Sequence, residues 1–472
     1  MASAPHMLYR HVCQAGARPQ PSLCAAGWLA ALVMVLAGMA EAVAAAPVQG
    51  SQTPQYLLVI SIDGLAWDAF ESRPTAMPTL AWMAKSGAAG PLTSVFPSMT
   101  WAAHASLWTG QLPVHHGVVG NRFYDRAKGK WVEYSEKGAE ILRTSTLADA
   151  AFRQGKTVAA LFWPNSGGAA SIAWNVPEMY REKDFARTTT PASRALLDAI
   201  GLPGATLSRL ASNESYTMDM ASQEMAVRLI QEHKPQVLFV HLLSVDTAAH
   251  SYGPASAAAT WAMTSADRNL AAILAAYDRA GIGSSLAAFV VSDHGFASVA
   301  RTVYVPAVLQ AVRAKAGVAS LQLMANGHAL YAYGLADKRA LTAAAAALRA
   351  TAGIERVVTT AEFAELGLAT PTQDDRSPDL IALAATNVLL WNGREPSKDG
   401  AQHMYGTHGY LPTAPGLQGV LVARGPGVAV GRVTGARVID VAPTAAVLLG
   451  LQLPGPVDGK VLGGVVAPAK PK

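Results

Sequence analysis

Short runs of apolar residues recur along the chain and are separated by longer stretches with helical periodicity. The runs are residues 56–62 (YLLVISI), 237–243 (VLFVHLL), 286–291 (LAAFVV) and 419–423 (GVLVA). Strands that are apolar at every position are typical of parallel sheets with both faces covered. The sequence therefore predicts an α/β fold, in which helices sandwich a central, largely parallel sheet.

Helical patterning fills the intervals between these runs, most clearly at residues 218–233 and 339–350. Residues 300–390 interrupt the sequence of strands, and we expect them to form a smaller inserted lobe or cap. Residues 165–215 are rich in Gly, Ser, Thr and Pro, which predicts long loops over the mouth of a site. The whole folded domain is predicted to span residues 54–468.

The first 46 residues have the organisation of a secretory signal peptide. Arg10 and Arg18 precede the apolar residues 25–40, and small residues with an A-x-A pattern follow at 42–46. An uncleaved membrane anchor is the alternative, but the apolar segment is shorter than the roughly 20 residues that a spanning helix needs. We therefore expect cleavage, no stable membrane span afterwards, and export, with the bacterial periplasm as the predicted location.

Composition and charge narrow the class of protein. Half of the chain is hydrophobic (51%), so a large core is available. Both cysteines, Cys13 and Cys24, lie in the predicted leader, so the mature chain has no thiol. The net charge of +5 is too weak and too dispersed to indicate specific nucleic-acid binding.

Carboxylates follow three of the predicted strands. Asp63 and Asp293 come directly after or close to the end of their apolar runs, and Asp246 follows a third. Ligands of parallel α/β sheets bind beyond the carboxyl ends of the strands. The three aspartates are therefore predicted to meet in one site.

Three histidines accompany these carboxylates. His250 follows Asp246 by four residues, His294 is next to Asp293, and His408 lies in a distant Gly-Thr-His-Gly segment. Mixed carboxylate and imidazole ligands suit borderline ions such as zinc. Two such ions, roughly 4 Å apart, can stabilise both the attacking and the leaving oxygen of a displacement.

Taken singly, each cluster has an ordinary structural interpretation. An Asp-Gly pair after a strand is usually a turn, and Asp246 with His250 is usually a pair on a helix surface. The segment around His408 alone is a turn. Ionisable residues directly after a buried strand, as at Asp293 and His294, are costly without partners. It is the joint occurrence of the clusters that favours a metal site.

The sequences of these motifs and their order along the chain resemble those of the alkaline phosphatase superfamily and, within it, of the nucleotide pyrophosphatase/phosphodiesterase family. The matching stretches run from residue 59 to residue 412 and are VISIDG, FPSMTWAAHASLWTG, HHGVVGN, LFWPNS, VDTAAHSYGP, VVSDHG and GTHGYLP. The chain departs from the family pattern at Ala102 and Ala103, where the family usually has Pro-Asn. This difference leaves the nucleophile and ligand positions intact.

The resemblance implies a two-zinc hydrolase with a phosphothreonine intermediate. Thr100 is implied to be the nucleophile, activated because the metal stabilises its alkoxide. The implied ligands of one zinc are Asp63, Asp293, His294 and the Thr100 hydroxyl, and those of the other are Asp246, His250 and His408.

Substrate contacts are also implied by the resemblance. Asn121 is expected to donate a hydrogen bond to a non-bridging phosphate oxygen, as is a backbone N–H near Thr100. Trp101 is the first candidate for stacking on a nucleobase and Tyr180 the second. The alternative for Trp101 is that it simply packs the start of a helix, and His104 is expected to be structural.

The choice of substrate depends on residues 157–180, where related monoesterases carry cationic side chains. This chain has no Lys or Arg there, but has Phe162, Trp163 and Trp174. Of these, Phe162 and Trp163 are expected to be core residues. The prediction is therefore a diesterase or pyrophosphatase that releases a nucleoside monophosphate from a small nucleotide or phosphodiester substrate. A phosphomonoesterase, a phosphonate hydrolase and, more remotely, a non-catalytic metal-binding protein remain alternatives, and the oligomeric state stays open.

Overall fold

The computed structural model describes residues 53–179, 181–203, 215–335, 337–394 and 404–468. Residues 50–472 form one compact unit. The predicted leader and Tyr180 lie outside the described residues. Within the described parts, no helix is both long and apolar enough to cross a membrane.

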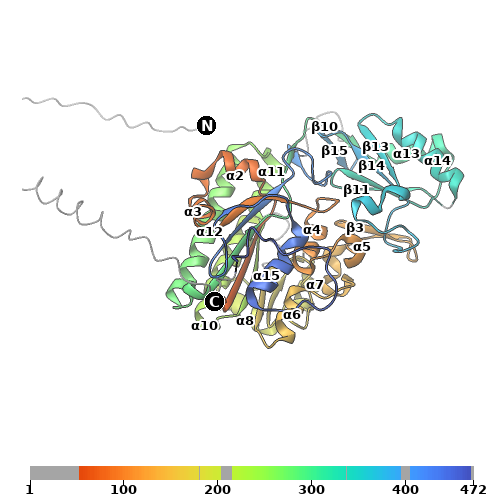
Figure 1. Cartoon of the computed structure of the whole chain (residues 1–472). Helices are drawn as coiled ribbons and strands as arrows, with labels where there is room; N and C mark the ends of the chain where they lie inside the picture. The colour runs from red at the N-terminus through yellow and green to blue at the C-terminus, as the bar shows by residue number, and fades with distance from the viewer. Residues whose placement is uncertain (1–52, 180, 204–214, 336, 395–403, 469–472) are drawn as a thin grey trace, which may run out of the picture. The chain divides into compact units, whose positions relative to one another are not determined.

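A large sheet forms the centre of the unit (Figure 1). Its strands, in spatial order, are β6 (Trp174–Pro177), β5 (Val158–Trp163), β7 (Val237–Leu242), β1 (Tyr56–Ile62), β8 (Leu286–Val291), β17 (Gly419–Arg424), β2 (Ala88–Thr93) and β18 (Gly431–Arg432), with β19 (Ala436–Arg437) also pairing with β2. Every pairing is parallel except those of β17, which runs antiparallel to β8 and β2. The predicted α/β fold with a largely parallel sheet is confirmed.

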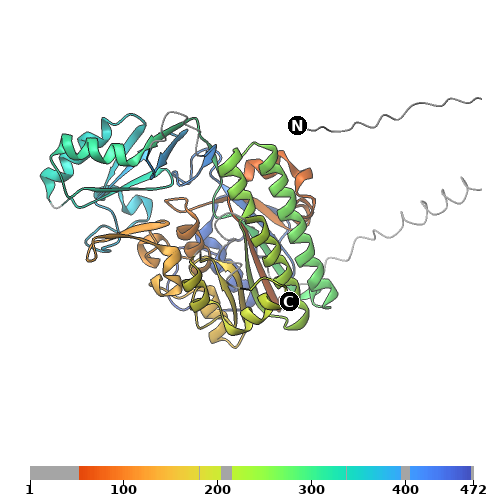
Figure 2. The same cartoon turned by 180° about the vertical axis from the view of Figure 1, so that it is seen from behind.

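Helices cover both faces of this sheet. Alternate residues of β1 point to opposite faces, as the two-residue period of a strand requires: Leu57 and Val59 enter one core, and Leu58 and Ile60 enter the other. The first core is covered by α4 (Thr100–Thr109), α6 (Leu147–Arg153) and α15 (Val441–Leu449). The second is covered by α3 (Pro78–Ser86), α10 (Ser215–Glu232) and α12 (Ala257–Arg279), and Figure 2 shows α10 and α12 side by side across it.

A smaller lobe is inserted between β8 and β17. Its four-stranded antiparallel sheet has the order β11 (Gln322–Asn326), β12 (Ala329–Tyr333), β14 (Leu380–Ala384) and β13 (Ile354–Thr359). The helices α13 (Val305–Ala316) and α14 (Lys338–Arg349) complete it, and β10 (Arg301–Tyr304) pairs with β15 (Val388–Trp391). A separate hydrophobic cluster lies within this segment. We call residues 301–391 the small lobe.

The stretch 165–215, expected to consist of long loops, contains regular structure in its described part. Besides β6 it holds α7 (Glu182–Thr188) and α8 (Pro191–Ala199). Pro191 occupies the first turn of α8, where its missing N–H costs nothing. Phe185 and Leu197 are buried and attach these helices to the core. The polar composition therefore marks the ends of short helices rather than one continuous loop.

Candidate metal centre

Three neighbouring strands bring the aspartates together. The strands β7, β1 and β8 are adjacent in the sheet. Asp63 directly follows β1, Asp293 lies two residues beyond β8, and Asp246 lies in the first turn of α11 (Ser244–Tyr252), which follows β7. The backbone N–H of Gly64 donates to Asp293 Oδ1 at 3.2 Å, which ties two of these segments together.

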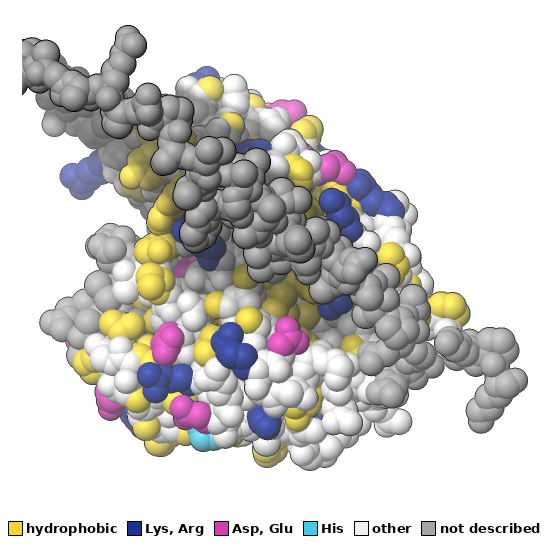
Figure 3. Space-filling model, turned by 90° about the vertical axis from the view of Figure 1, so that its left-hand side faces the viewer, with side chains coloured by type: hydrophobic (Ala, Val, Ile, Leu, Met, Phe, Trp, Pro, Cys, Tyr) yellow, Lys and Arg dark blue, Asp and Glu magenta, His cyan; other side chains and the backbone are white. Residues whose placement is uncertain are grey.

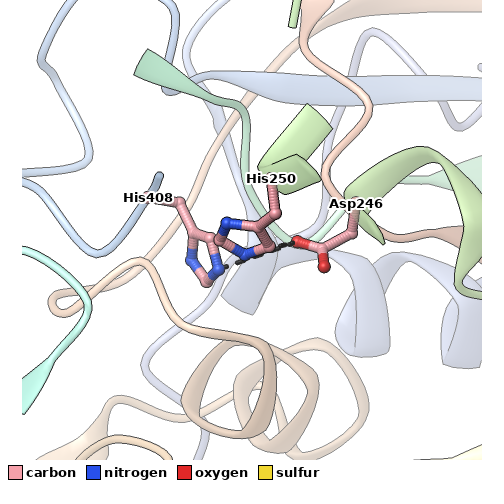
Figure 4. Close-up of side chains that lie close together, drawn as sticks. All are labelled: Asp246, His250 and His408. Carbon is pink, nitrogen blue, oxygen red and sulfur yellow. Dashed lines mark ion pairs between the residues drawn. The ribbon is translucent and has the colours of Figure 1, made fainter. Parts of the chain in front are cut away.

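The histidines arrive from different segments of the chain. His250 lies one turn after Asp246 on α11. His408 follows β16 (Gly406–Thr407), which pairs antiparallel with β9 (Ala297–Ser298), a strand that begins shortly after His294. This small two-stranded sheet places His408 beside His294, and their rings stack with centroids 3.7 Å apart. Figure 4 shows His250 and His408 pointing toward the Asp246 carboxylate.

The ligand atoms form two overlapping groups. Asp246, His250 and His408 each offer an atom within 4.8 Å of the others, and so do Asp63, Asp246 and His294. The second group draws on Asp246, whereas the resemblance assigned Asp293 beside Asp63. Asp293 is nevertheless close, because its Oδ2 lies 3.2 Å from His294 Nε2.

The spacing between these atoms fits ligands around an ion. His250 Nε2 lies 3.4 Å from Asp246 Oδ1, and His294 Nε2 lies 3.4 Å from Asp63 Oδ1. Atoms bound tetrahedrally at about 2.0–2.1 Å from zinc lie about 3.3 Å from one another.

The protonation of the three imidazoles follows from their other contacts. Each Nδ1 faces a backbone carbonyl: His250 faces Gly406 O at 2.9 Å, His408 faces Ser98 O at 2.9 Å, and His294 faces Gly295 O at 3.2 Å. Since a carbonyl oxygen only accepts, Nδ1 must carry the proton in each ring. In the neutral form of such a ring, Nε2 has a lone pair directed at the carboxylates, as a metal ligand requires.

Burial and mutual repulsion make this cluster unfavourable without a cation. Burial, then the charges of Asp293 and Asp246, raise the pKa of Asp63 well above its usual value. Burial raises the pKa of Asp246 to about 6, against the attraction of His250. Burial lowers the pKa of His294 to about 3 and that of His408 well below its usual value, so both rings stay neutral.

Buried oxygen atoms without hydrogen-bond partners test whether these residues fit a bound metal ion. Asp63 Oδ1, Asp246 Oδ1 and Asp293 Oδ2 are buried and accept no hydrogen bond. Unpaired buried carboxylate oxygens are costly. The donor set, with free lone pairs on three carboxylates and three imidazoles, fits divalent ions of the zinc type.

Thr100 lies beside this cluster at the start of a helix. It is the first residue of α4, is 8% exposed, and places its Oγ1 3.5 Å from His294 Nε2. The first turn of a helix directs N–H groups at a bound anion. One of them is engaged, because the Trp101 N–H donates to Asn121 Oδ1 at 3.2 Å. The Asn121 Nδ2 is therefore the part of this amide left to donate to a substrate.

Two residues that the sequence analysis did not identify support the site. His241, on β7, is fully buried; its Nε2 lies 3.2 Å from Asp63 Oδ2 and its Nδ1 lies 3.0 Å from Glu178 Oε2. Burial opposes a charge on His241, but its hydrogen bonds and charge interactions with Asp63 and Glu178 outweigh it and raise the pKa of His241 well above the usual range. A lone histidine inside an apolar run was the only signal in the sequence.

His104 has a structural position. Its Nδ1 donates to the backbone carbonyl of Thr100 at 2.8 Å, one turn earlier in α4. The ring packs edge-on against Trp163 at 5.0 Å between centroids. These contacts fix the first turn of the helix that carries Thr100.

A cavity of about 870 Å³ opens at the cluster. The small lobe contributes to its wall, because the β11–β12 turn and the end of β15 line it with Asn326, Gly327, Trp391 and Asn392. Gly327 has a positive φ of 59°, and a Cβ there would lie 2.5 Å from His408 O and 2.6 Å from Met99 Sδ. Only glycine lets this turn approach so closely.

The described aromatic residues of the segment 157–180 lie away from the cavity. Phe162 and Trp163 are fully buried core residues, and Trp174 stacks on His233 with centroids 4.9 Å apart; none of the three lines the cavity. Trp101 lines the cavity but is only 3% exposed and belongs to the core. Trp391, which the sequence analysis did not select, is half-buried and lines the cavity.

Comparisons with known proteins show what this chain is similar to. The family described as Type I phosphodiesterase / nucleotide pyrophosphatase matches residues 57–411. Among curated relatives, a venom phosphodiesterase of Crotalus durissus collilineatus is 22% identical over 54% of this chain, and the human ectonucleotide pyrophosphatase/phosphodiesterase family member 1 is 23% identical over 52%. The aligned parts make up 27% and 24% of those proteins, so this chain spans about a quarter of their length.

Solved structures match over most of the chain. Murine ectonucleotide pyrophosphatase/phosphodiesterase 5 superposes with a TM-score of 0.65 at 19% identity, covering 86% of this chain and 98% of the murine one. An inactive form of the same murine protein in complex with AMP gives the same TM-score at 18% identity.

The fold and the converging acids and imidazoles define an α/β protein with a candidate metal centre. The family match covers three-quarters of the sequence, which is enough to assign the chain to a family. The chain belongs to the Type I phosphodiesterase / nucleotide pyrophosphatase family.

Proposed function

We propose that this protein is a two-zinc hydrolase of nucleotide phosphodiester or pyrophosphate bonds that releases a nucleoside monophosphate. The observation that carries the proposal is the convergence of free ligand atoms beside the Thr100 hydroxyl at the start of α4. Asp63, Asp293, His294 and Thr100 would hold one ion, and Asp246, His250 and His408 would hold the other.

Bound zinc would supply a Lewis acid that stabilises the Thr100 alkoxide and offsets the charge of the phosphoryl group. Thr100 Oγ1 then attacks phosphorus, and the bond to the leaving oxygen breaks to give a phosphothreonine that still carries the nucleoside as a second ester. Water attacks the same phosphorus, releases the nucleoside monophosphate and regenerates the Thr100 hydroxyl. The Asn121 Nδ2 donates to a non-bridging oxygen, where charge develops in the transition state.

The charge of the cavity supports a diester or pyrophosphate rather than a monoester. Among its described lining residues Arg122 is the one Lys or Arg, and its guanidinium pairs with Glu133 Oε1 at 2.9 Å. Glu178 adds a further acid to the wall. A monoester dianion has one more negative charge to neutralise at the phosphoryl group than a diester, and the described part of the wall offers no unpaired Lys or Arg for it.

The volume and lining suit a small nucleotide. A cavity of about 870 Å³ is within the range that holds small-molecule ligands. Trp391 offers a face for stacking on a base. On the face in Figure 3, Lys and Arg are interspersed with Asp and Glu.

A rate comparison on two chromogenic substrates tests the proposal. The purified mature chain should hydrolyse the para-nitrophenyl ester of thymidine monophosphate much faster than para-nitrophenyl phosphate, and metal analysis should find about two zinc ions per chain. Faster hydrolysis of the monoester would overturn the diesterase assignment and favour a phosphomonoesterase.

Export to the periplasm is part of the proposal and rests only on the pattern of residues 10–46. Mass spectrometry of protein isolated from the periplasm of an expressing bacterium should find a new N-terminus close to Ala46. Recovery of the full chain from the membrane fraction would contradict cleavage.

A further inference from the structure

Asn326 of the small lobe is hydrogen-bonded to the backbone on both sides of Asn121. Its Oδ1 accepts from the N–H groups of Asn121 and Arg122, both at 3.0 Å, and its Nδ2 donates to the carbonyl of Arg122 at 3.0 Å. The side chain is 1% exposed. One buried amide thus satisfies three backbone groups more than 200 residues away in the sequence.

The contact is too close to be incidental. A Cβ at Gly120 would lie 2.8 Å from Asn326 Cγ, so a larger residue there would push the amide away. A second buried side chain of the small lobe, Tyr331 on β12, donates its hydroxyl to Val119 O at 2.6 Å. The small lobe therefore holds the segment 119–122 at two points.

This segment positions the Asn121 side chain. The Asn121 Oδ1 accepts from the Trp101 N–H in the first turn of α4, next to Thr100. Asn326 holds the backbone of Asn121, and the Trp101 N–H holds its Oδ1. Together these contacts fix the orientation of the Asn121 carboxamide, with Nδ2 available to the substrate. Such preorganised donors stabilise charge in a transition state.

We propose that Asn326 is a positioning residue for Asn121, through which the small lobe forms part of the active site. The inference rests on the proposed function, in that it requires Asn121 to act on the phosphoryl group. It predicts that Asn326 influences the reaction through Asn121 alone. A purely structural role, in which Asn326 only docks the lobe, predicts independent effects of the two residues.

A double-mutant cycle separates these two roles. Asn121→Ala is expected to lower kcat on the nucleotide diester by about 10²–10³-fold, as the loss of one transition-state donor does. Asn326→Ala should lower kcat by about tenfold or more with little change in KM. The double variant should be no slower than Asn121→Ala alone, within about twofold. Zinc content should stay at the wild-type value in all three, since none of them removes a ligand.

Two further variants serve as controls. Asn326→Asp keeps an oxygen acceptor for both N–H groups and should retain more activity than Asn326→Ala. Tyr333→Phe removes a different buried hydrogen bond of the same lobe, from the Tyr333 hydroxyl to Arg376 O at 2.8 Å. It should lower the melting temperature but leave kcat unchanged.

Each contrary outcome is distinguishable. If Asn121→Ala is fully active, the proposed role of Asn121 fails and the inference fails with it. If Asn121→Ala is slow but Asn326→Ala is not, or if their effects multiply, only the positioning role is overturned. A drop in kcat for Tyr333→Phe as large as that for Asn326→Ala would likewise overturn it in favour of general loosening of the lobe.

Discussion

His241 Nε2 lies 3.2 Å from Asp63 Oδ2, deep in the sheet and on the side of the carboxylate away from His294. The other ring nitrogen of His241 faces Glu178, so the imidazole bridges two buried acids. It occupies one oxygen of Asp63 and leaves Oδ1 directed toward the candidate metal centre. Partners of this kind orient metal ligands, and their loss lowers metal affinity.

Removing this bridge should destabilise the protein. His241→Leu removes the buried imidazole that lies between Asp63 and Glu178, and breaking a buried charged pair costs about 3–5 kcal/mol. Urea unfolding of the zinc-loaded protein should show a loss of this size, and zinc content after dialysis should fall.

The matched control is His233→Leu, because His233 lies at the surface with 39% of its side chain exposed. It removes the stack of His233 on Trp174 and should cost at most about 1.5 kcal/mol, less than the loss expected for His241→Leu. Equal stability of the His241→Leu variant and the wild type would show that the bridge is not a structural element of the site.

Replacing the nucleophile should separate catalysis from metal binding. Thr100→Ala removes the hydroxyl 3.5 Å from His294 Nε2 but leaves six ligand side chains in place. Turnover of the thymidine diester should fall by at least about 10³-fold, because no other route to a covalent intermediate exists. Metal analysis of the same sample should still find about two zinc ions.

Thr100→Ser keeps the hydroxyl and is the control for this substitution. It should retain measurable turnover and form a phosphorylated protein with the same substrate. Substantial activity of Thr100→Ala would refute the assignment of Thr100.

The sequence predicted most of the sheet, because local signals specify it, and the three aspartates and three histidines proposed as ligands lie close together in the structure. Strands that are apolar at every position are recognisable in isolation, and an aspartate at the end of such a strand must lie at the edge of the sheet. A helix that begins near Thr100 was also predicted, and α4 begins at that residue. These features depend on a few neighbouring residues, and the structure reproduces β1 and β8 with their predicted bounds.

The features that the sequence left hidden depend on contacts between distant segments. Nothing near His241 indicates that Glu178 lies beside it, and nothing near Asn326 indicates that it bonds to Asn121. Phe162 and Trp163 lie in the core, as expected, but the sequence did not show that Trp174 also lies away from the cavity. A strand alternates its side chains between two faces, and the sequence did not reveal which face meets the cavity.

Metal binding should depend on pH through the carboxylates. Burial raises the pKa of Asp246 to about 6, while His294 and His408 stay neutral because their pKa values are lowered. Zinc binds the ionised carboxylate, so protons compete with it below about pH 6 and apparent affinity should fall by about tenfold per pH unit. Equilibrium dialysis against buffered zinc between pH 5 and pH 7 measures this dependence.

In the metal-free protein, raising the pH has the opposite effect: it lowers the contribution of Asp246 to stability, whereas it raises the affinity for zinc. The pKa of Asp246 is higher in the fold than the 3.8 expected when unfolded, so ionisation favours the unfolded chain. The contribution of Asp246 to stability is therefore greatest below about pH 4 and is lost as pH rises to about 6. The difference in melting temperature between zinc-loaded and metal-free protein should widen from pH 5 to pH 7, and a constant difference would contradict the assignment of Asp246 as a ligand.

Two tryptophans line the cavity, and their burial predicts different roles. Trp391 ends β15 and is half-buried, so part of its ring is available to a ligand, whereas Trp101 is 3% exposed. Base stacking contributes about 1–3 kcal/mol per base. Trp391→Ala should therefore raise KM for the thymidine diester by about 5–150-fold, and Trp391→Phe, which keeps a ring, should raise it less.

A second substrate makes this comparison specific to the base. Methyl para-nitrophenyl phosphate is a diester without a nucleobase, so Trp391→Ala should leave its KM close to the wild-type value. Trp101→Ala removes a large core side chain, which costs about 3–5 kcal/mol of stability, and should impair both diesters alike. If Trp101→Ala selectively weakened the nucleotide diester while Trp391→Ala did not, the base would have to stack at the start of α4, and the small lobe would lose its role in substrate binding.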